Sequence, residues 1–96
     1  MITELSCIYD TRQSFYGKAK VETRKTQKGF YITELYSYGT LVADIKDYGY
    51  LKKYCYYGKY SQTTTRHQKE FFKQNGLTDK EIKELFKNEI LEKVVC

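Results

Sequence analysis

The chain has 96 residues, a length that accommodates one domain (residues 1–96) and leaves no room for a second. Hydrophobic residues make up 41% of it, which is enough for one core and too many for a disordered chain, and no long apolar run predicts a membrane span. The N-terminus has no basic segment followed by an apolar one, so we expect no secretory signal and a cytoplasmic location in the cell that makes the protein.

The net charge is +5, and the basic excess is unevenly distributed. Residues 1–76 carry 13 Lys and Arg against 7 Asp and Glu, whereas residues 77–96 carry 4 against 5. Such an excess attracts polyanions: nucleic acid, an acidic protein face or an anionic membrane surface. The alternative is a basic surface without a particular partner.

The first part of the chain alternates apolar and polar residues, as the strands of a half-buried antiparallel sheet do. In KAKVETR, residues 18–24, Ala19, Val21 and Thr23 point one way and mostly basic side chains point the other. Turn residues then recur about every 8 to 12 residues, which is the rhythm of a meander. The expected strands are residues 3–9, 18–24, 30–37, 41–47 and 50–58.

After residue 60 the hydrophobic period changes to that of a helix. Residues 62–75 are expected to form a polar helix with a narrow apolar face. Ser61 or Thr63 can cap its exposed N–H groups, and Gly76 stands where a left-handed residue ends a helix.

Residues 79–94 are expected to form a second, amphipathic helix that begins with a T-x-x-E capping box at Thr78 and Glu81. Its apolar side, helped by Phe71, is expected to cover one face of the sheet. The side chains on that side are Ile82, Leu85, Phe86 and Ile90. The predicted fold class is therefore α+β: an antiparallel sheet of about five strands within residues 3–57, followed by two C-terminal helices packed on one face.

Few residues suggest catalysis or metal binding. His67 is the only histidine, and the chain has neither a GxSxG motif nor a glycine-rich phosphate loop. The three cysteines lack CxxC spacing, which argues against a zinc knuckle and a disulfide framework. Asp44 and Asp47 could join His67 at a divalent metal, but DIKD is a common surface sequence. We therefore expect a protein that is not an enzyme and has no metal and no cofactor, with a small enzyme that uses His67 as the remote alternative.

Tyrosine and lysine alternate around the last expected strand, so the face of the sheet opposite the helices is the expected working surface. Aromatic rings that stack on bases, beside cations that neutralise phosphates, are typical of proteins that bind single-stranded polynucleotides. The same pattern is also typical of a protein-binding face or of an ordinary edge strand, in which lysine prevents aggregation.

The segment TTTRH places Arg66 beside the free N–H groups of a helix start, which makes it a candidate anion site. The alternative is that a threonine caps the helix while His67 packs against the sheet. The candidate binding surface consists of Arg12, Tyr16, Lys18, Lys20, Lys52, Lys53, Tyr54, Tyr56, Tyr60 and Arg66.

Three blocks of sequence carry a resemblance to a known group of proteins. They are YDTRQSFYGKA (residues 9–19), SYGTLVA (37–43) and YSQTTTRHQKEF (60–71), the last followed by QNG (74–76). They resemble a family of small uncharacterised proteins from phages and other mobile elements of low-GC Gram-positive bacteria. The long block is distinctive, whereas the KTQKG turn and the last helix lie outside the resemblance.

The resemblance implies a biological setting rather than an activity, because the family has no established activity to carry over. Small phage accessory proteins often bind a host macromolecule, and inhibitors of host immunity are among them. The leading hypothesis is therefore a non-catalytic inhibitor of a host defence nucleoprotein, such as an anti-CRISPR protein that acts on a Cas9-type effector. The alternative is a single-stranded nucleic-acid-binding protein in phage replication or regulation. We expect no membrane partner.

Overall fold

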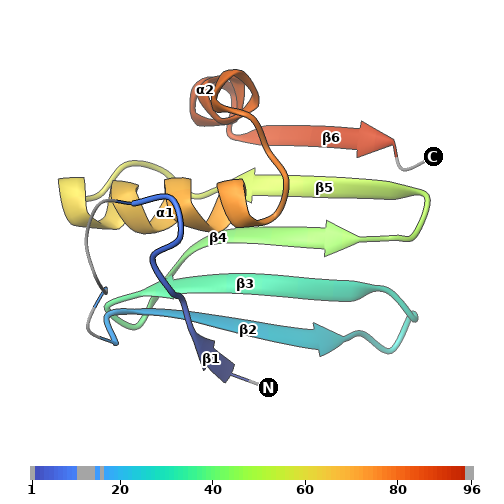
Figure 1. Cartoon of the computed structure of the whole chain (residues 1–96). Coiled ribbons are helices and arrows are strands. Elements are labelled where there is room, and N and C mark those ends of the chain that lie inside the picture. Colours follow the sequence, from blue (N-terminus) through green and yellow to red (C-terminus); the bar gives the residue numbers. More distant parts are fainter. Residues whose placement is uncertain (1, 11–14, 16, 95–96) are drawn as a thin grey trace.

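The computed structural model describes residues 2–10, 15 and 17–94. Their backbone forms one antiparallel sheet of six strands and two helices (Figure 1). The elements are, in chain order, β1 (Ile2–Glu4), β2 (Ala19–Lys25), β3 (Tyr31–Ser37), β4 (Thr40–Asp47), β5 (Leu51–Tyr56), α1 (Gln62–Gln74), α2 (Asp79–Asn88) and β6 (Ile90–Val94). The strands lie in the sheet in the order β1 to β6, so the α+β class and the meander are confirmed, with six strands rather than about five.

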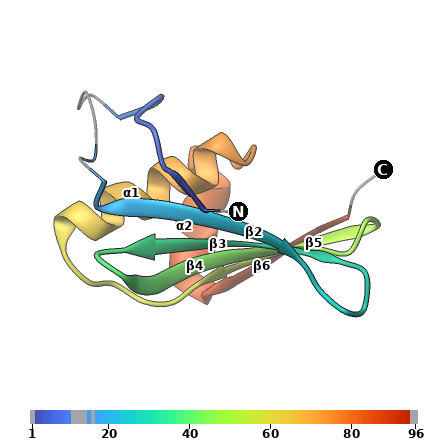
Figure 2. The same cartoon turned by 90° about the horizontal axis from the view of Figure 1, so that it is seen from below.

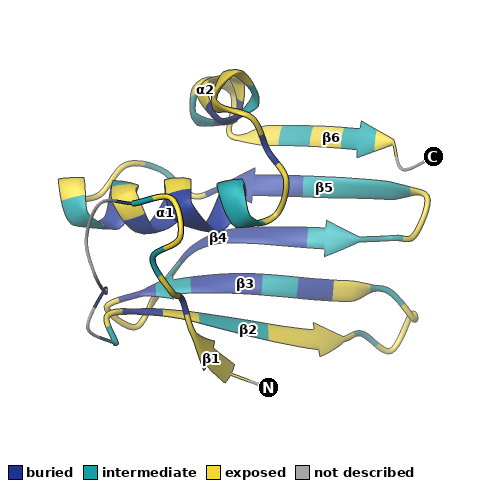
Figure 3. Cartoon of the chain, in the orientation of Figure 1, coloured by how far each residue is buried: buried dark blue, intermediate teal, exposed yellow. Residues whose placement is uncertain are grey.

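The helices lie on one face of the sheet, which we call the helix face, and the described residues place no helix on the opposite, open face (Figure 2). α1 packs against β3 and β4 and runs roughly along the strands, whereas α2 is seen end-on beside β6 in Figure 1. Figure 3 shows the buried residues gathered beneath the helices and more exposed residues toward the strand ends farther from α1. The core contains Leu35, Ala43, Ile45, Phe71, Phe72, Ile82 and Leu85.

Both helix starts are capped by the residues that the sequence indicated. The Ser61 hydroxyl accepts the N–H of Thr64 at 3.1 Å, so Ser61 rather than Thr63 is the N-cap of α1. At α2, Thr78 and Glu81 form the reciprocal capping box. These caps satisfy N–H groups that a helix end otherwise leaves without partners.

The predicted strand over residues 3–9 is wrong beyond Glu4. β1 pairs with β2 only through Ile2–Glu4, and Leu5 adds one further bond from its N–H to the carbonyl of Ala19. The chain then leaves the sheet and passes over α1, because the buried Glu70 carboxylate accepts the N–H groups of Tyr9 and Asp10. β2 begins at Ala19 and offers no strand partner beyond Leu5, and a side chain 60 residues away from Asp10 fixes the chain over the helix instead.

The predicted helix over residues 79–94 is also too long. α2 ends at Asn88, and Glu89 adopts the left-handed conformation with φ of 70°. The chain reverses there, and residues 90–94 pair with β5 as β6. Ile90, expected beneath the helix, is instead 49% exposed at this edge. Its apolar residues fit a strand as well as a helix, and the open edge of β5 supplies hydrogen-bond partners along the whole segment.

Candidate nucleic-acid interface

The histidine of the TTTRH segment is a structural residue of the interface between α1 and the sheet. His67 is fully buried, and its Nδ1 lies 2.8 Å from the hydroxyl oxygen of Ser37. Ser37 also bonds the hydroxyl of Thr64 at 3.0 Å, and the ring of Phe15 meets the imidazole edge-on at 4.5 Å between centroids. This packing supports the alternative in which His67 packs against the sheet.

Arg66 lies on the exposed side of α1, where it faces a carboxylate. Its Nη1 is 3.6 Å from Oδ1 of Asp10. The two residues line a small cavity of about 100 Å³ together with Tyr9, Lys69, Glu70 and Lys73. The Arg66 side chain is 45% exposed and that of Asp10 is 12% exposed, so solvent still reaches the guanidinium and the pair contributes little to stability. The Asp10 carboxylate nevertheless offsets the positive charge of Arg66, which an anion at the start of α1 would need.

The sheet register assembles a second basic region at the end where the β2–β3 and β4–β5 turns lie side by side (Figure 1). On the helix face, one cross-strand row joins five strands here. It consists of Lys25, Tyr31, Asp47, Lys52 and Lys93. The neighbouring row on the open face consists of Arg24, Ile32, Lys46, Lys53 and Glu92. Cations from four strands thus converge at one end of the sheet.

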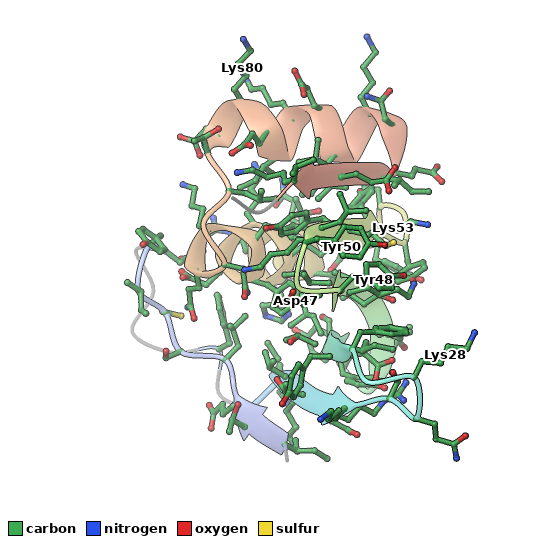
Figure 4. All side chains as sticks on the ribbon, turned by 90° about the vertical axis from the view of Figure 1, so that its right-hand side faces the viewer. Lys28, Asp47, Tyr48, Tyr50, Lys53 and Lys80 are labelled. Carbon is green, nitrogen blue, oxygen red and sulfur yellow. The ribbon has the colours of Figure 1, made fainter. Side chains whose placement is uncertain are left out.

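Aromatic rings cap this end. The rings of Phe30 and Tyr48 lie 4.6 Å apart, and the ring of Tyr50 follows at 6.3 Å from Tyr48. Tyr50 is 70% exposed and Tyr31 is 50% exposed, with Nζ of Lys25 5.9 Å from the Tyr31 ring centroid. In Figure 4, Lys28 extends away from one turn, and Tyr48 and Tyr50 lie together on the neighbouring turn.

We call this region the basic hairpin end. It comprises Lys25, Lys28, Phe30, Tyr31, Lys46, Tyr48, Tyr50, Lys52 and Lys53. Its five lysines outnumber the three nearby carboxylates, Asp44, Asp47 and Glu92, of which Asp44 pairs with Lys46 at 3.8 Å. Asp47 is moreover occupied as an acceptor, because it binds the N–H of Gly49 at 2.9 Å. The net field at this end therefore favours an anionic ligand.

The predicted binding residues do not form one surface. Lys52 and Lys53 belong to the basic hairpin end, on opposite faces of β5. Lys18 and Lys20 lie at the other end of the sheet, around a separate cleft. Tyr60 is exposed just before the start of α1. Arg12 and Tyr16 lie outside the described residues.

The expectation that Tyr54 and Tyr56 are binding residues is wrong, since they are only 3% and 7% exposed. Both point to the helix face, where Tyr56 stacks on Phe86 at 4.3 Å and Tyr54 meets Phe72 edge-on. The unforeseen β6 makes β5 an internal strand, and α2 covers the rings. Desolvation by this burial raises the pKa of both phenols.

The centre of the open face is also not the Tyr/Lys surface that the sequence suggested. Here the register aligns three carboxylates in one row across β2, β3 and β4: Glu22, Glu34 and Asp44. Arg24 pairs with Glu34 at 3.2 Å, and the Tyr57 hydroxyl donates to Asp44. Burial, followed by the bond to Asp44, raises the pKa of Tyr57. This acidic row separates the basic regions at the two ends of the sheet.

Of the nine residues of the basic hairpin end, only Lys52 and Lys53 belonged to the predicted surface, and the other seven, Phe30 and Tyr31 among them, were absent from it. The signal was present in the KTQKGFY segment, which joins two lysines and two aromatic rings at a turn. Tyr48, whose ring contacts that of Phe30, lies 18 residues farther along the chain. The two could not be recognised as neighbours without the strand register.

The described residues contain no cluster of three or more His, Cys, Asp or Glu side chains placed to hold a metal ion. In the same part of the chain, none of the helices has the length and apolar character needed to span a bilayer.

Comparison with known proteins identifies a family but no function. No curated protein and no solved structure matches the chain. A family model does match, and it covers residues 3–89, which contain β1 to β5 and both helices. The chain therefore belongs to the family described as a family of unknown function, DUF8033.

Proposed function

We propose that this protein is a non-catalytic binding protein that takes up single-stranded nucleic acid at the basic hairpin end. The observation that carries the proposal is the meeting of exposed aromatic rings and lysines from four strands at one end of the sheet. Successive bases can stack on such rings in any sequence, while the ammonium groups neutralise phosphates. Tyr50 and Tyr31 expose the rings that stacking requires.

Single strands fit this end better than a duplex does. The rings stand on two neighbouring turns rather than on a helix that could enter a major groove. Stacking on a side chain also requires unpaired bases, which a single strand offers and a duplex does not. The burial of His67 supports the non-catalytic part of the proposal, because a general base must reach the substrate.

Fluorescence anisotropy with labelled single-stranded RNA, single-stranded DNA and duplex DNA tests the proposal. We expect the single strands to bind more tightly than the duplex, with an affinity that falls as salt rises. The double variant Lys52→Glu/Lys53→Glu should weaken binding at least about tenfold, since it reverses two cations of the site.

The matched control is Lys80→Glu/Lys83→Glu, which makes the same charge change on exposed positions of α2, away from the basic hairpin end (Figure 4). It should retain most of the affinity. Equal losses in the two variants would show that net charge alone drives binding, and would contradict a site at the hairpin end. A Tyr50→Ser variant separates stacking from charge, because it leaves all lysines in place.

An inhibitor of a host defence nucleoprotein is the second candidate, acting in the cytoplasm of a bacterial host. The observation that favours it is that both turns of the basic hairpin end extend beyond the helices (Figures 1 and 2). A projecting end can reach nucleic acid that a larger protein holds in a groove. Co-elution of the chain with a CRISPR effector loaded with its guide, but not with free RNA, would favour this candidate over the first.

A further inference from the structure

The turn between β3 and β4 holds a tyrosine in an unfavourable backbone conformation. Ser37 pairs with Thr40, and the two residues between them, Tyr38 and Gly39, have φ of 52° and 82°. Two-residue turns with positive φ at both positions favour Asn-Gly or Gly-Gly, because a Cβ with a bulky substituent is strained there. Tyrosine at the first position therefore costs stability relative to asparagine.

Burial in the core does not explain why a tyrosine occupies this turn position. Tyr38 is 57% exposed, and its ring is tilted against that of His67 with 5.9 Å between the centroids. Its N–H donates to the carbonyl of Lys18 at 2.8 Å, which ties the turn to the start of β2. The backbone that carries a half-exposed ring is thus fixed in a strained conformation at an energetic cost. Strain of this kind is characteristic of ligand-binding positions.

The ring stands beside a cleft of about 290 Å³, which we call the Tyr38 cleft. It is lined by Gly17, Lys18, Lys20, Tyr36, Tyr38 and Gly39. Both lysines are exposed, and Lys20 lies directly opposite Tyr36 in the register. The cleft is at the lower end of the size range of small-molecule sites.

The charges around the Tyr38 cleft favour a ligand with one anionic group. The nearest carboxylate on the neighbouring strand is Glu4, which lies opposite Lys20 and accepts the N–H of Gly17 at 2.9 Å. Two ammonium groups therefore face one carboxylate that is already engaged. The carboxylates of Glu22 and Glu34 lie one row farther along β2 and β3 and repel an anion from the middle of the sheet. An anion is therefore favoured at the end of the sheet that carries Lys18 and Lys20.

We propose that the Tyr38 cleft binds a nucleotide phosphate: Lys18 and Lys20 hold the phosphate, and the base stacks on the ring of Tyr38. The ammonium groups supply charge-assisted hydrogen bonds to phosphate oxygens, and the phenol ring supplies a flat surface for the base. The ligand is a free mononucleotide or the terminal nucleotide of a strand. The cleft is separated from the basic hairpin end by the acidic row, so the proposal is independent of the function proposed for that end.

An NMR titration with ¹⁵N-labelled protein tests the proposal with adenosine monophosphate, adenosine and inorganic phosphate as probes. We expect the monophosphate to shift the amide signals of Lys18, Tyr38 and Gly39. The nucleoside and the phosphate should each bind at least about tenfold more weakly, because each lacks one of the two recognised groups. A 5′-phosphorylated oligonucleotide forms the second arm, with the same oligonucleotide lacking the phosphate as its control and the amides of the Tyr38 cleft as the readout. Tighter binding at these amides than the monophosphate shows, lost without the 5′-phosphate, identifies a strand end, and equal binding identifies the free nucleotide.

Tyr38→Asn is the decisive variant. Asparagine suits the turn and keeps the backbone in place, yet it removes the ring, so monophosphate binding should fall about tenfold or more in a folded protein. The matched control is Tyr50→Asn at the basic hairpin end, which should leave the shifts at the Tyr38 cleft unchanged. Unchanged binding by Tyr38→Asn, or shifts confined to the basic hairpin end, would overturn the proposal. Failure here leaves the single-strand proposal intact, because that proposal is measured through Lys52 and Lys53.

Discussion

Ser37 and His67 are 30 residues apart in the sequence, yet the Ser37 hydroxyl oxygen lies 2.8 Å from Nδ1 of His67. The bond is buried, and it joins the end of β3 to the middle of α1. A serine beside a histidine resembles a nucleophile and its base. Because both side chains are inaccessible, the pair serves to position α1 on the sheet.

His67→Ala should therefore destabilise the protein by about 2–4 kcal/mol, since it leaves a cavity and removes one of the two partners of the buried Ser37 hydroxyl. Urea unfolding followed by circular dichroism measures the change. Gln62→Ala, at an exposed position of the same helix, is the control and should change stability by less than about 0.5 kcal/mol. A stable His67→Ala protein would contradict the structural role. Loss of function in this variant does not by itself reveal an enzyme, because loss of folding gives the same result.

Glu70→Ala should release the segment of residues 5–10 from α1. The Glu70 carboxylate accepts the N–H groups of Tyr9 and Asp10 at 2.9 and 2.8 Å, and these bonds disappear with the side chain. Hydrogen exchange at the two amides should accelerate markedly, while exchange in β3 and β4 changes little. Glu84→Ala, on the exposed side of α2, is the matched control. Unchanged protection at Tyr9 and Asp10 would show that other contacts hold the segment.

Glu81→Gln should lower stability at neutral pH and have no effect in acid. The N–H of Thr78, followed by the ammonium of Lys93, lowers the pKa of Glu81 in the folded protein. A carboxyl group with a lowered folded-state pKa contributes stability above its unfolded pKa of about 4.3, and this contribution is lost as pH falls through the folded value. The effect should be small, because the group is largely solvated.

Thermal unfolding of the wild type and of Glu81→Gln from pH 7 down to about pH 3 checks the direction in which the stability difference changes with pH. The two melting temperatures should differ most at neutral pH and converge below about pH 4. A difference that grows in acid would contradict the assignment. Glu84→Gln, which lies on the same helix, should show no such convergence.

Tyr38→Asn should raise the melting temperature even though it removes a large side chain. A left-handed conformation costs a bulky L-residue roughly 1–2 kcal/mol, and asparagine pays less of this cost. For a domain of this size, a gain of about 1 kcal/mol corresponds to a rise of about 4–8 °C. Differential scanning calorimetry measures it. A lower melting temperature would show that the contact of Tyr38 with His67 outweighs the strain.

Local patterns in the sequence were sufficient where one segment carried the whole signal. The turn that ends at Gly29, the Ser61 cap and the Thr78–Glu81 capping box each depend on residues within one or two turns of chain. The alternation of Ala19, Val21 and Thr23 likewise indicated β2 and its face, and α1 was placed to within one residue at its end. Short-range sterics and hydrogen bonding decide such features before any tertiary contact forms.

Tertiary contacts decided the rest. The chain leaves the sheet after β1 and is held over α1 by the distant Glu70, which accepts the N–H groups of Tyr9 and Asp10, and residues 90–94 are a strand because the edge of β5 lies within reach. The same strand makes Tyr54 and Tyr56 core residues instead of binding residues. The basic hairpin end and the Tyr38 cleft depend on which residues of separate strands stand opposite one another. Composition supplied the lysines and tyrosines, but only the register brings them into groups, because charge and stacking act over a few ångströms in space and not along the chain.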